Sequence, residues 1–83
     1  MIGSKGPFHA AEETMHKAMM SAEGSTVDET WVRKMIAHHE GAIAMSQILL
    51  REGTDSAVRQ MASKSIEEQT KDIDELNKLI GGR

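Results

Sequence analysis

The 83-residue sequence contains no cysteine and no tyrosine, and it has only one phenylalanine, one tryptophan and one proline. The absence of cysteine excludes disulfide bonds, zinc sites built on thiolates and catalysis by a thiol. The soft metal ligands that remain are the side chains of seven methionines and four histidines. Because methionine also fills gaps in helical cores, packing is the commoner explanation for any single one of them.

Long hydrophobic runs and an excess of positive charge are also missing. No stretch reaches the roughly 18 apolar residues of a membrane-spanning helix, and the opening segment MIGSKGPF lacks the regions of a signal peptide. The formal net charge of −3 and the pI of about 5.7 disfavour nucleic acid and anionic lipid as partners. We expect one domain, residues 1–83, whose small core gains from a metal ion or a partner chain.

Glycine-rich and polar segments divide the chain into three predicted helices, at about residues 7–22, 27–52 and 55–80. Pro7 suits the first turn of the first helix, where its missing N–H group is not needed. The sequence shows neither the alternation typical of strands nor an internal repeat. The predicted fold class is therefore all-α, a long antiparallel hairpin covered by a shorter N-terminal helix.

Local signals also predict how the second and third helices begin and end. Thr26 and Glu29, three residues apart, form a capping box at the start of the second helix. Gly53 is expected to end that helix in a left-handed conformation. Thr54 or Asp55 is expected to cap the third helix.

The predicted helix 27–52 is amphipathic, and its apolar half includes two adjacent histidines. At about 100° per residue, one half of the helical wheel carries polar residues such as Arg33, Glu40 and Arg51. The other half, which we expect to be buried, holds Trp31, Val32, Met35, Ile36, His38, His39, Ala42, Ile43, Met45, Ser46, Leu49 and Leu50.

The short connection after residue 52 forces the second and third helices into an antiparallel hairpin. In this hairpin we expect His38 to lie opposite Gln69 and Met35 opposite Asp72, which makes a polar layer inside an apolar seam. The other pairs expected along the seam are apolar: Trp31 with Leu76, and Met45 with Met61 and Ala62.

Two explanations remain open for this polar layer. Buried imidazoles need partners, and His38 and His39 could find them in Gln69, Asp72 and the backbone, as a structural network that fixes the hairpin register. Alternatively the histidines are metal ligands, because Met35 lies one helical turn before both of them and can share an ion with either. In that case Gln69 and Asp72 support the ligands rather than bind the metal.

Met45 is too distant to share an ion with His38 within one helix. At a rise of about 1.5 Å per residue, the two lie roughly 10 Å apart along the axis. Met45 therefore joins a second site, completes a site with a neighbouring chain, or belongs to the core. Because the core is small, we also expect the chain to form a homodimer and so a larger helical bundle.

A second cluster of soft ligands lies in the first predicted helix, in the segment MHKAMM. His16 precedes Met19 by one helical turn, and so does Met15. Met15 and Met19 fall on the apolar stripe of this helix, which favours a role in the core. His9, His16 and Met20 lie on another edge, which either faces solvent or holds ligands.

The ligand types predict which ion would bind. Thioether sulfur is soft and imidazole is intermediate, a combination that favours Cu(I), with Ag(I) and Cu(II) next, over Mg²⁺ or Ca²⁺. Methionine also suits an oxidising compartment, where thiols would form disulfides.

Catalytic interpretations find little support in the sequence. The segment HHEGA lacks the second histidine of the zinc protease motif, and Glu13 with His16 provides only one of the two motifs of a di-iron bundle. We therefore expect a protein that is not an enzyme.

The segment MIAHHEGAIAM, from Met35 to Met45, resembles the signature of the bacterial domain of unknown function 305, a ferritin-like helical family. The upstream MH with its following Met, the segment LREG and the downstream VRQMA and DIDEL fit the same pattern, so the likeness extends from about Phe8 to Ile80. The chain departs from the family pattern at Ala37, Glu40 and Ala44.

The resemblance implies export to the periplasm or cell surface and, for some members, copper or silver binding in metal tolerance. Carried over residue by residue, it implies two groups of metal ligands and one supporting position. These are Met35, His38, His39 and Met45, then Met15, His16 and Met19, with Gln69 in support. We expect non-catalytic copper binding in the periplasm; the alternative is a helical interaction module whose histidines form a metal-free core network.

Overall fold

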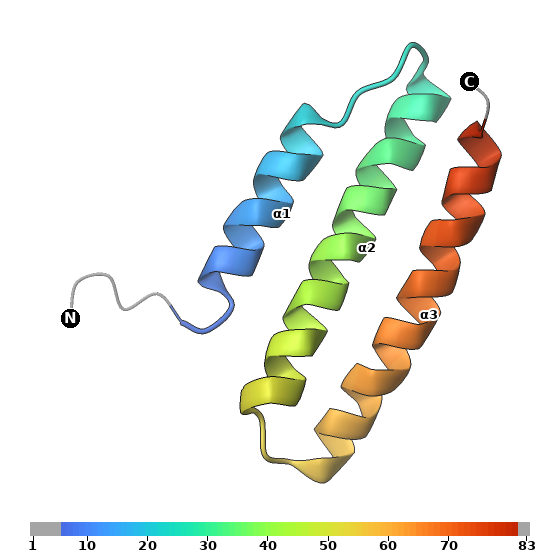
Figure 1. The fold of residues 1–83 in the computed structure, drawn as a ribbon. Coiled ribbons are helices and arrows are strands. Elements are labelled where there is room, and N and C mark those ends of the chain that lie inside the picture. Colours follow the sequence, from blue (N-terminus) through green and yellow to red (C-terminus); the bar gives the residue numbers. More distant parts are fainter. Residues whose placement is uncertain (1–5, 82–83) are drawn as a thin grey trace.

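The computed structural model describes residues 6–81 and contains three α-helices, α1 (His9–Ser21), α2 (Val27–Glu52) and α3 (Ser56–Ile80) (Figure 1). The all-α class and the long hairpin of α2 and α3 are confirmed. The bounds of α2 are those expected. The first helix starts later than expected, because Pro7 lies in the turn before it and Phe8 is its N-cap residue.

The N-terminus of α2 is held by a dense set of side-chain hydrogen bonds. The Thr26 hydroxyl accepts from the Glu29 backbone N–H at 3.0 Å, as the capping box predicts. The Glu29 carboxylate reaches back one residue further than expected and accepts from the backbone N–H and hydroxyl of Ser25 at 3.1 and 2.9 Å. Arg33 donates to its other oxygen at 2.8 Å. The Arg33 bond, followed by those from Ser25, lowers the pKa of Glu29 from 4.5 to about 2.

The turn between α2 and α3 is extended rather than left-handed. Gly53 has φ of −79°, so the expected left-handed stop is wrong. A small residue is required there because an added Cβ atom would lie 2.7 Å from the backbone oxygen of Leu49. Asp55, not Thr54, caps α3, accepting from the Val58 N–H at 3.0 Å. Arg59 closes the turn by donating to the Leu50 and Gly53 carbonyl groups.

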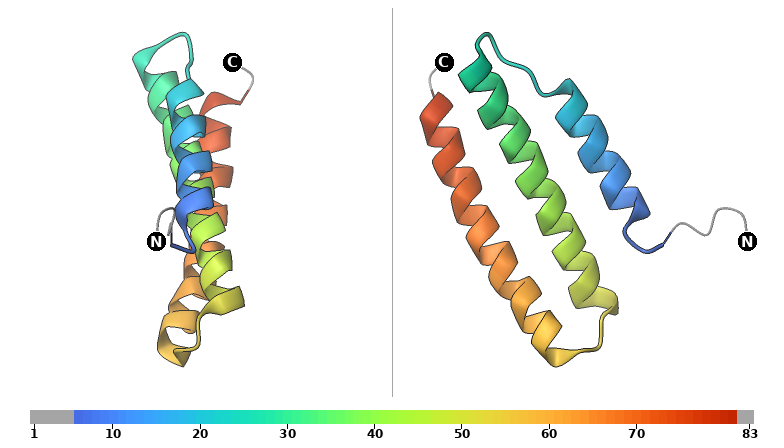
Figure 2. Two further views of the ribbon diagram at one scale, coloured as in Figure 1. Left: turned by 90° about the vertical axis from the view of Figure 1, so that its left-hand side faces the viewer. Right: turned by 180° about the vertical axis from the view of Figure 1, so that it is seen from behind.

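The three helices form one layer with α2 in the middle. In the two views of Figure 2 the helices lie side by side when seen from behind and overlap when seen from the edge. The described chain extends 42 × 32 × 14 Å, which is about one helix thick. Within the described helices, no Cα atom of α1 lies within 8 Å of α3. The first helix thus lies beside the hairpin, along the free side of α2. The expectation that it covers the hairpin is wrong.

This layer has a very small core. The buried hydrophobic residues are Val32, Ala37 and Ala62, and no large side chain among the described residues is fully buried. On the α1 side of α2, Gly41 allows close approach, because an added Cβ atom would lie 2.3 Å from the Met15 sulfur. No helix in the described part is long and apolar enough to cross a membrane.

Candidate metal centre

The most organised polar group in the α2–α3 seam is His39, whose side chain is 20% exposed. Its Nδ1 atom lies 2.7 Å from the backbone oxygen of Met35, one helical turn earlier. A carbonyl oxygen can only accept a hydrogen bond, so Nδ1 must carry the proton in this contact. In the neutral ring the lone pair is then on Nε2, which lies on the α3 side. Histidines that bind metal ions usually donate their other ring N–H to such an acceptor, so this contact is compatible with a ligand role.

Across the seam, His39 Nε2 lies 3.6 Å from the Asp72 carboxylate, which is 56% exposed. This distance supports an ion pair when the ring is protonated and leaves the lone pair of the neutral ring free of a donor. The sequence placed Asp72 correctly beside the polar layer. The side chain paired with Asp72 is that of His39, whereas Met35, its predicted neighbour, shares a groove with it.

His39 opens into a groove of about 230 Å³ between α2 and α3. Met35 and Trp31 precede His39 by one and two helical turns and line the same groove. Leu76 lies on the opposite wall, as the predicted pairing of Trp31 with Leu76 requires. The groove therefore combines a thioether, an imidazole and an indole ring from one helix with the carboxylates of Asp72 and Glu75 from the other.

His38 lies outside this groove. Its side chain is exposed, so the expectation that both histidines are buried is wrong for His38 and holds in part for His39. The two rings have centroids 6.2 Å apart in an edge-on arrangement. Gln69 is half-buried, but the described residues show no hydrogen bond from it to either histidine.

Met45 lies at the other end of the hairpin and helps to line a second groove of about 410 Å³. Met61 and Ala62 line the same groove, as the predicted register requires, and Phe8 reaches it from the segment before α1. This groove contains no histidine. Met45 is thus separated from His39, in agreement with the distance estimated from the sequence.

The soft ligands of α1 differ in their surroundings. Met15 packs on Gly41 in the α1–α2 seam. Met19 is half-buried, and its carbonyl oxygen accepts from Lys34 Nζ at 2.5 Å. His16 is exposed. The proposed α1 ligands are therefore spread over two sides of the helix, and Met15 and Met19 contribute to packing.

The described residues contain no group of three or more His, Cys, Asp or Glu side chains that could hold a metal ion. Zinc sites in proteins are typically built from three or four such side chains. Among the described residues, Met35 and His39 are the soft ligands that lie together in one groove of the α2–α3 seam. Trp31 was not expected to belong to this site, although its place two turns before His39 on the same stripe was visible in the sequence.

Comparison with known proteins identifies the family. The family model described as domain of unknown function (DUF305) matches residues 3–80, and the chain belongs to this family. No curated protein matches the chain significantly.

Proposed function

We propose that this member of the DUF305 family binds a soft metal ion, most favourably Cu(I), without catalysing a reaction. The observation that supports this function is the groove in which Met35 and His39 lie one turn apart, with Nδ1 of His39 fixed by the Met35 carbonyl. This arrangement directs the free Nε2 lone pair toward the α3 wall of the groove. One side of α2 thereby offers sulfur and nitrogen to a single ion.

The chemistry of the groove favours a monovalent soft ion. Thioether sulfur binds Cu(I) and Ag(I) better than it binds hard divalent ions. The indole ring of Trp31 lines the same groove and can attract a cation through its π face. Asp72 would balance the added positive charge from its place beside His39.

The physiological role that we propose is copper buffering or tolerance in the periplasm or at the cell surface. A site built on methionine and histidine keeps its ligands where cysteine would be oxidised. The chain contains no cysteine at all. Silver would occupy the same ligands, since it shares the preference of Cu(I) for soft donors.

A second candidate function, a metal-free interaction module, is favoured by a different observation. Several large apolar side chains are strongly exposed, among them Trp31 at 56% and Met61 at 64%. Exposed apolar surface of this kind is typical of binding faces. In this case the contact of His39 with Asp72 would be a structural link between the helices.

A competition titration with Cu(I) tests the proposed function. We expect both His39→Ala and Met35→Leu to weaken Cu(I) binding, while His9→Ala, which removes an imidazole paired with Glu13 on α1, leaves it unchanged. Met35→Leu conserves side-chain volume, so a loss of affinity there reports the sulfur rather than packing. Equal affinity in the wild type and both groove variants would rule out this site.

A further inference from the structure

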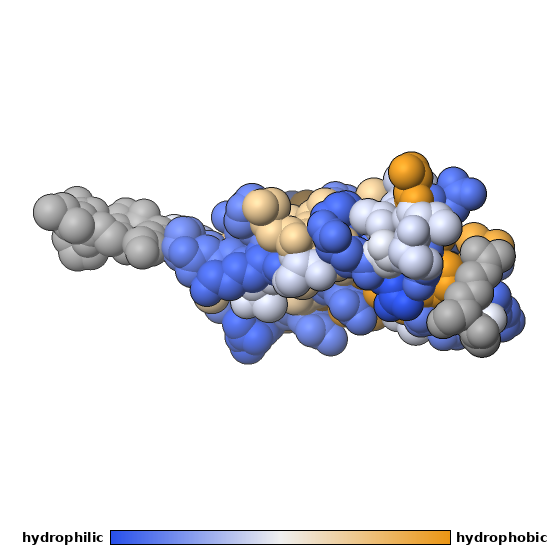
Figure 3. All heavy atoms as spheres, turned by 90° about the horizontal axis from the view of Figure 1, so that it is seen from above, coloured by the Kyte–Doolittle hydropathy of each residue, from blue (hydrophilic) through white to orange (hydrophobic). Residues whose placement is uncertain are grey.

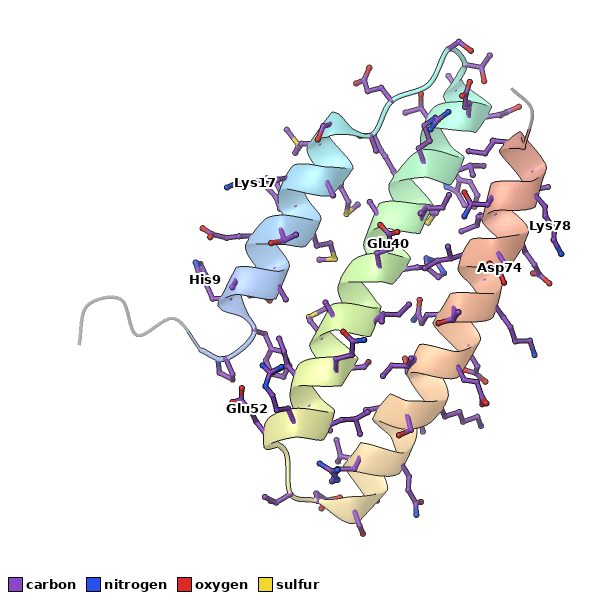
Figure 4. All side chains as sticks on the ribbon, in the orientation of Figure 1. His9, Lys17, Glu40, Glu52, Asp74 and Lys78 are labelled. Carbon is purple, nitrogen blue, oxygen red and sulfur yellow. The ribbon has the colours of Figure 1, made fainter. Side chains whose placement is uncertain are left out.

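The helical layer has two chemically different faces. Glu40 points toward the viewer in Figure 4, on the front of α2. Trp31 precedes Glu40 by nine residues, about two and a half turns, so it points to the back. Leu49 follows Trp31 by eighteen residues, about five full turns, and points the same way. The groove beside His39 and the groove beside Met45 therefore open on one face, which we call the apolar face.

The apolar face extends over α3 as well. Met61 and Leu79 are also eighteen residues apart and line the two grooves, one each. They are 64% and 59% exposed, and Trp31 is 56% exposed. The right-hand view of Figure 2 looks at the ribbon from the back, the side on which this face lies, and the end view in Figure 3 shows hydrophobic residues at the surface of the thin layer.

A second layer of helices is what this fold lacks. Helices bury their apolar stripes by packing in at least two layers around one core. The layer extends 42 × 32 Å across its face. The area of this face is larger than the area of about 800 Å² that each partner buries in a standard interface. A second copy has the same extent and the same apolar stripe, so face-to-face packing would cover the grooves of both copies.

The charge distribution is compatible with such self-association. The stripe of α2 along the middle of the apolar face contains no Lys, Arg, Asp or Glu: Trp31, Met35, His38, Ala42, Met45 and Leu49. Carboxylates lie at the two ends of this stripe, Asp28 and Glu52, and on the flanking helices, where Glu12, Asp72 and Glu75 are exposed. Two copies packed on this stripe therefore place no like charges at the centre of the interface.

His38 occupies a special position on this face. It follows Trp31 by seven residues, about two turns, and so lies on the apolar side of α2. It also lies at the middle of α2, which runs from Val27 to Glu52 and is the middle helix. When two such layers overlap fully about a two-fold axis in the interface, parallel or perpendicular to the helices, the middle of α2 meets itself. Both arrangements bring His38 close to its own copy.

We propose that a second copy of this chain covers the apolar face, and that the two His38 imidazoles meet at its centre to form a soft-metal site shared between the copies. The metal part of this inference rests on the proposed function, whereas the interface does not. The shared site also explains why His38 is exposed in a single chain while the neighbouring His39 contacts Asp72 of α3. The exposed ring is a ligand that needs a partner.

Sedimentation equilibrium over a dilution series, without metal, tests the interface. The wild type should form dimers, and Met61→Glu should shift them to monomers. Gln47→Glu is the matched control, because it adds the same carboxylate at an exposed position on the opposite face of α2. Circular dichroism should show equal helicity in all three. A wild type that stays monomeric throughout, or a Gln47→Glu variant that dissociates as readily as Met61→Glu, would overturn the interface.

The same measurement with Ag(I) tests the shared site. We expect Ag(I) to lower the dissociation constant of the wild-type dimer by at least about tenfold, and His38→Ala to dimerise without metal but lose this effect. His9→Ala should keep it. An unchanged response in His38→Ala would overturn the shared site. If Cu(I) binds in the Met35–His39 groove of a protein that stays monomeric, only this inference fails. If His39→Ala and Met35→Leu bind Cu(I) as tightly as the wild type does, the proposed function fails.

Discussion

The Nδ1 atom of His39 lies 2.7 Å from the Met35 carbonyl oxygen, and this contact determines which ring nitrogen faces α3. The backbone of α2 thus selects the tautomer of its own side chain one turn later. Met35 has two roles in the candidate site, since its carbonyl group orients His39 and the residue lines the same groove.

This contact predicts the tautomer of His39 in solution. Long-range ¹H–¹⁵N spectra, recorded where the His39 ring is neutral, should show this ring protonated at Nδ1. Addition of Ag(I) should shift the Nε2 resonance selectively. The exposed ring of His16 serves as the control. Protonation of His39 at Nε2 in the neutral state would contradict the orientation described here.

Metal binding should raise thermal stability. A ligand that binds only the folded state adds about 2.7 kcal/mol when present at about 100 times its dissociation constant. The shift in melting temperature on adding Cu(I) should therefore be larger for the wild type than for His39→Ala, which lacks the groove ligand. Equal melts for the wild type would instead favour the metal-free interaction module.

Acid should weaken the start of α2 through Glu29. Its pKa falls from 4.5 to about 2 on folding, chiefly because Arg33 and Ser25 donate hydrogen bonds to the carboxylate. The resulting stability is fully present above pH 4.5 and is lost as the pH falls through about 2. The difference in unfolding free energy between the wild type and Glu29→Gln should shrink over this range. Glu23→Gln, an exposed neighbour, provides the baseline, and a pH-independent difference would argue against this contact.

Gly41→Ala should loosen the contact between α1 and α2. The added Cβ atom would lie 2.3 Å from the Met15 sulfur and 2.8 Å from its Cβ atom, so side-chain motion alone cannot relieve the clash. Overpacking costs about 1–3 kcal/mol, and alanine returns up to about 1 kcal/mol through helix propensity. In a Met15→Ala background the cost should be smaller, because the contacts with the sulfur and Cγ atoms are gone and only the 2.8 Å contact with the Cβ atom remains. Urea unfolding of the four proteins measures this coupling, and additive effects would show that the two residues do not touch.

Asp55→Ala should destabilise α3 by about 1 kcal/mol, because the first turn loses the acceptor of the Val58 N–H group. Thr54→Ala is the matched control, since Thr54 is adjacent and exposed but makes no cap. Urea midpoints compare the two variants. Equal losses would mean that the turn, rather than the cap, sets the stability of this end.

The helices could be predicted from the sequence because their signals are local. Thr26, Glu29 and Asp55 bond within their own first turn, so spacing alone identifies them. The direction of His38 could not be predicted in this way. The helical wheel placed it in the same half as His39, but adjacent residues point about 100° apart, and the helices that pack on α2 decide which of the two is covered.

The side of α2 on which α1 packs left a weak signal that the sequence interpretation missed. Ala37, Gly41 and Ala44 recur at helical spacing and line the α1 side of α2. Small residues at this spacing permit close helix approach, whereas the interpretation treated α2 as having one apolar half. The hairpin register was approximately correct, since Trp31 and Leu76 share one groove and Met45 and Met61 the other.

The flat order of the helices also shapes how the chain folds. Within residues 6–81, packing joins only helices that follow one another in sequence, α1 with α2 and α2 with α3. Such short-range topology favours rapid folding, because no long loop has to close before contacts form. Damage to α1 should leave α2 and α3 assembled, and damage to α3 should leave α1 and α2 assembled. A defect in α2 should disturb every tertiary contact between helices. The central helix is therefore where mutations should be tolerated least.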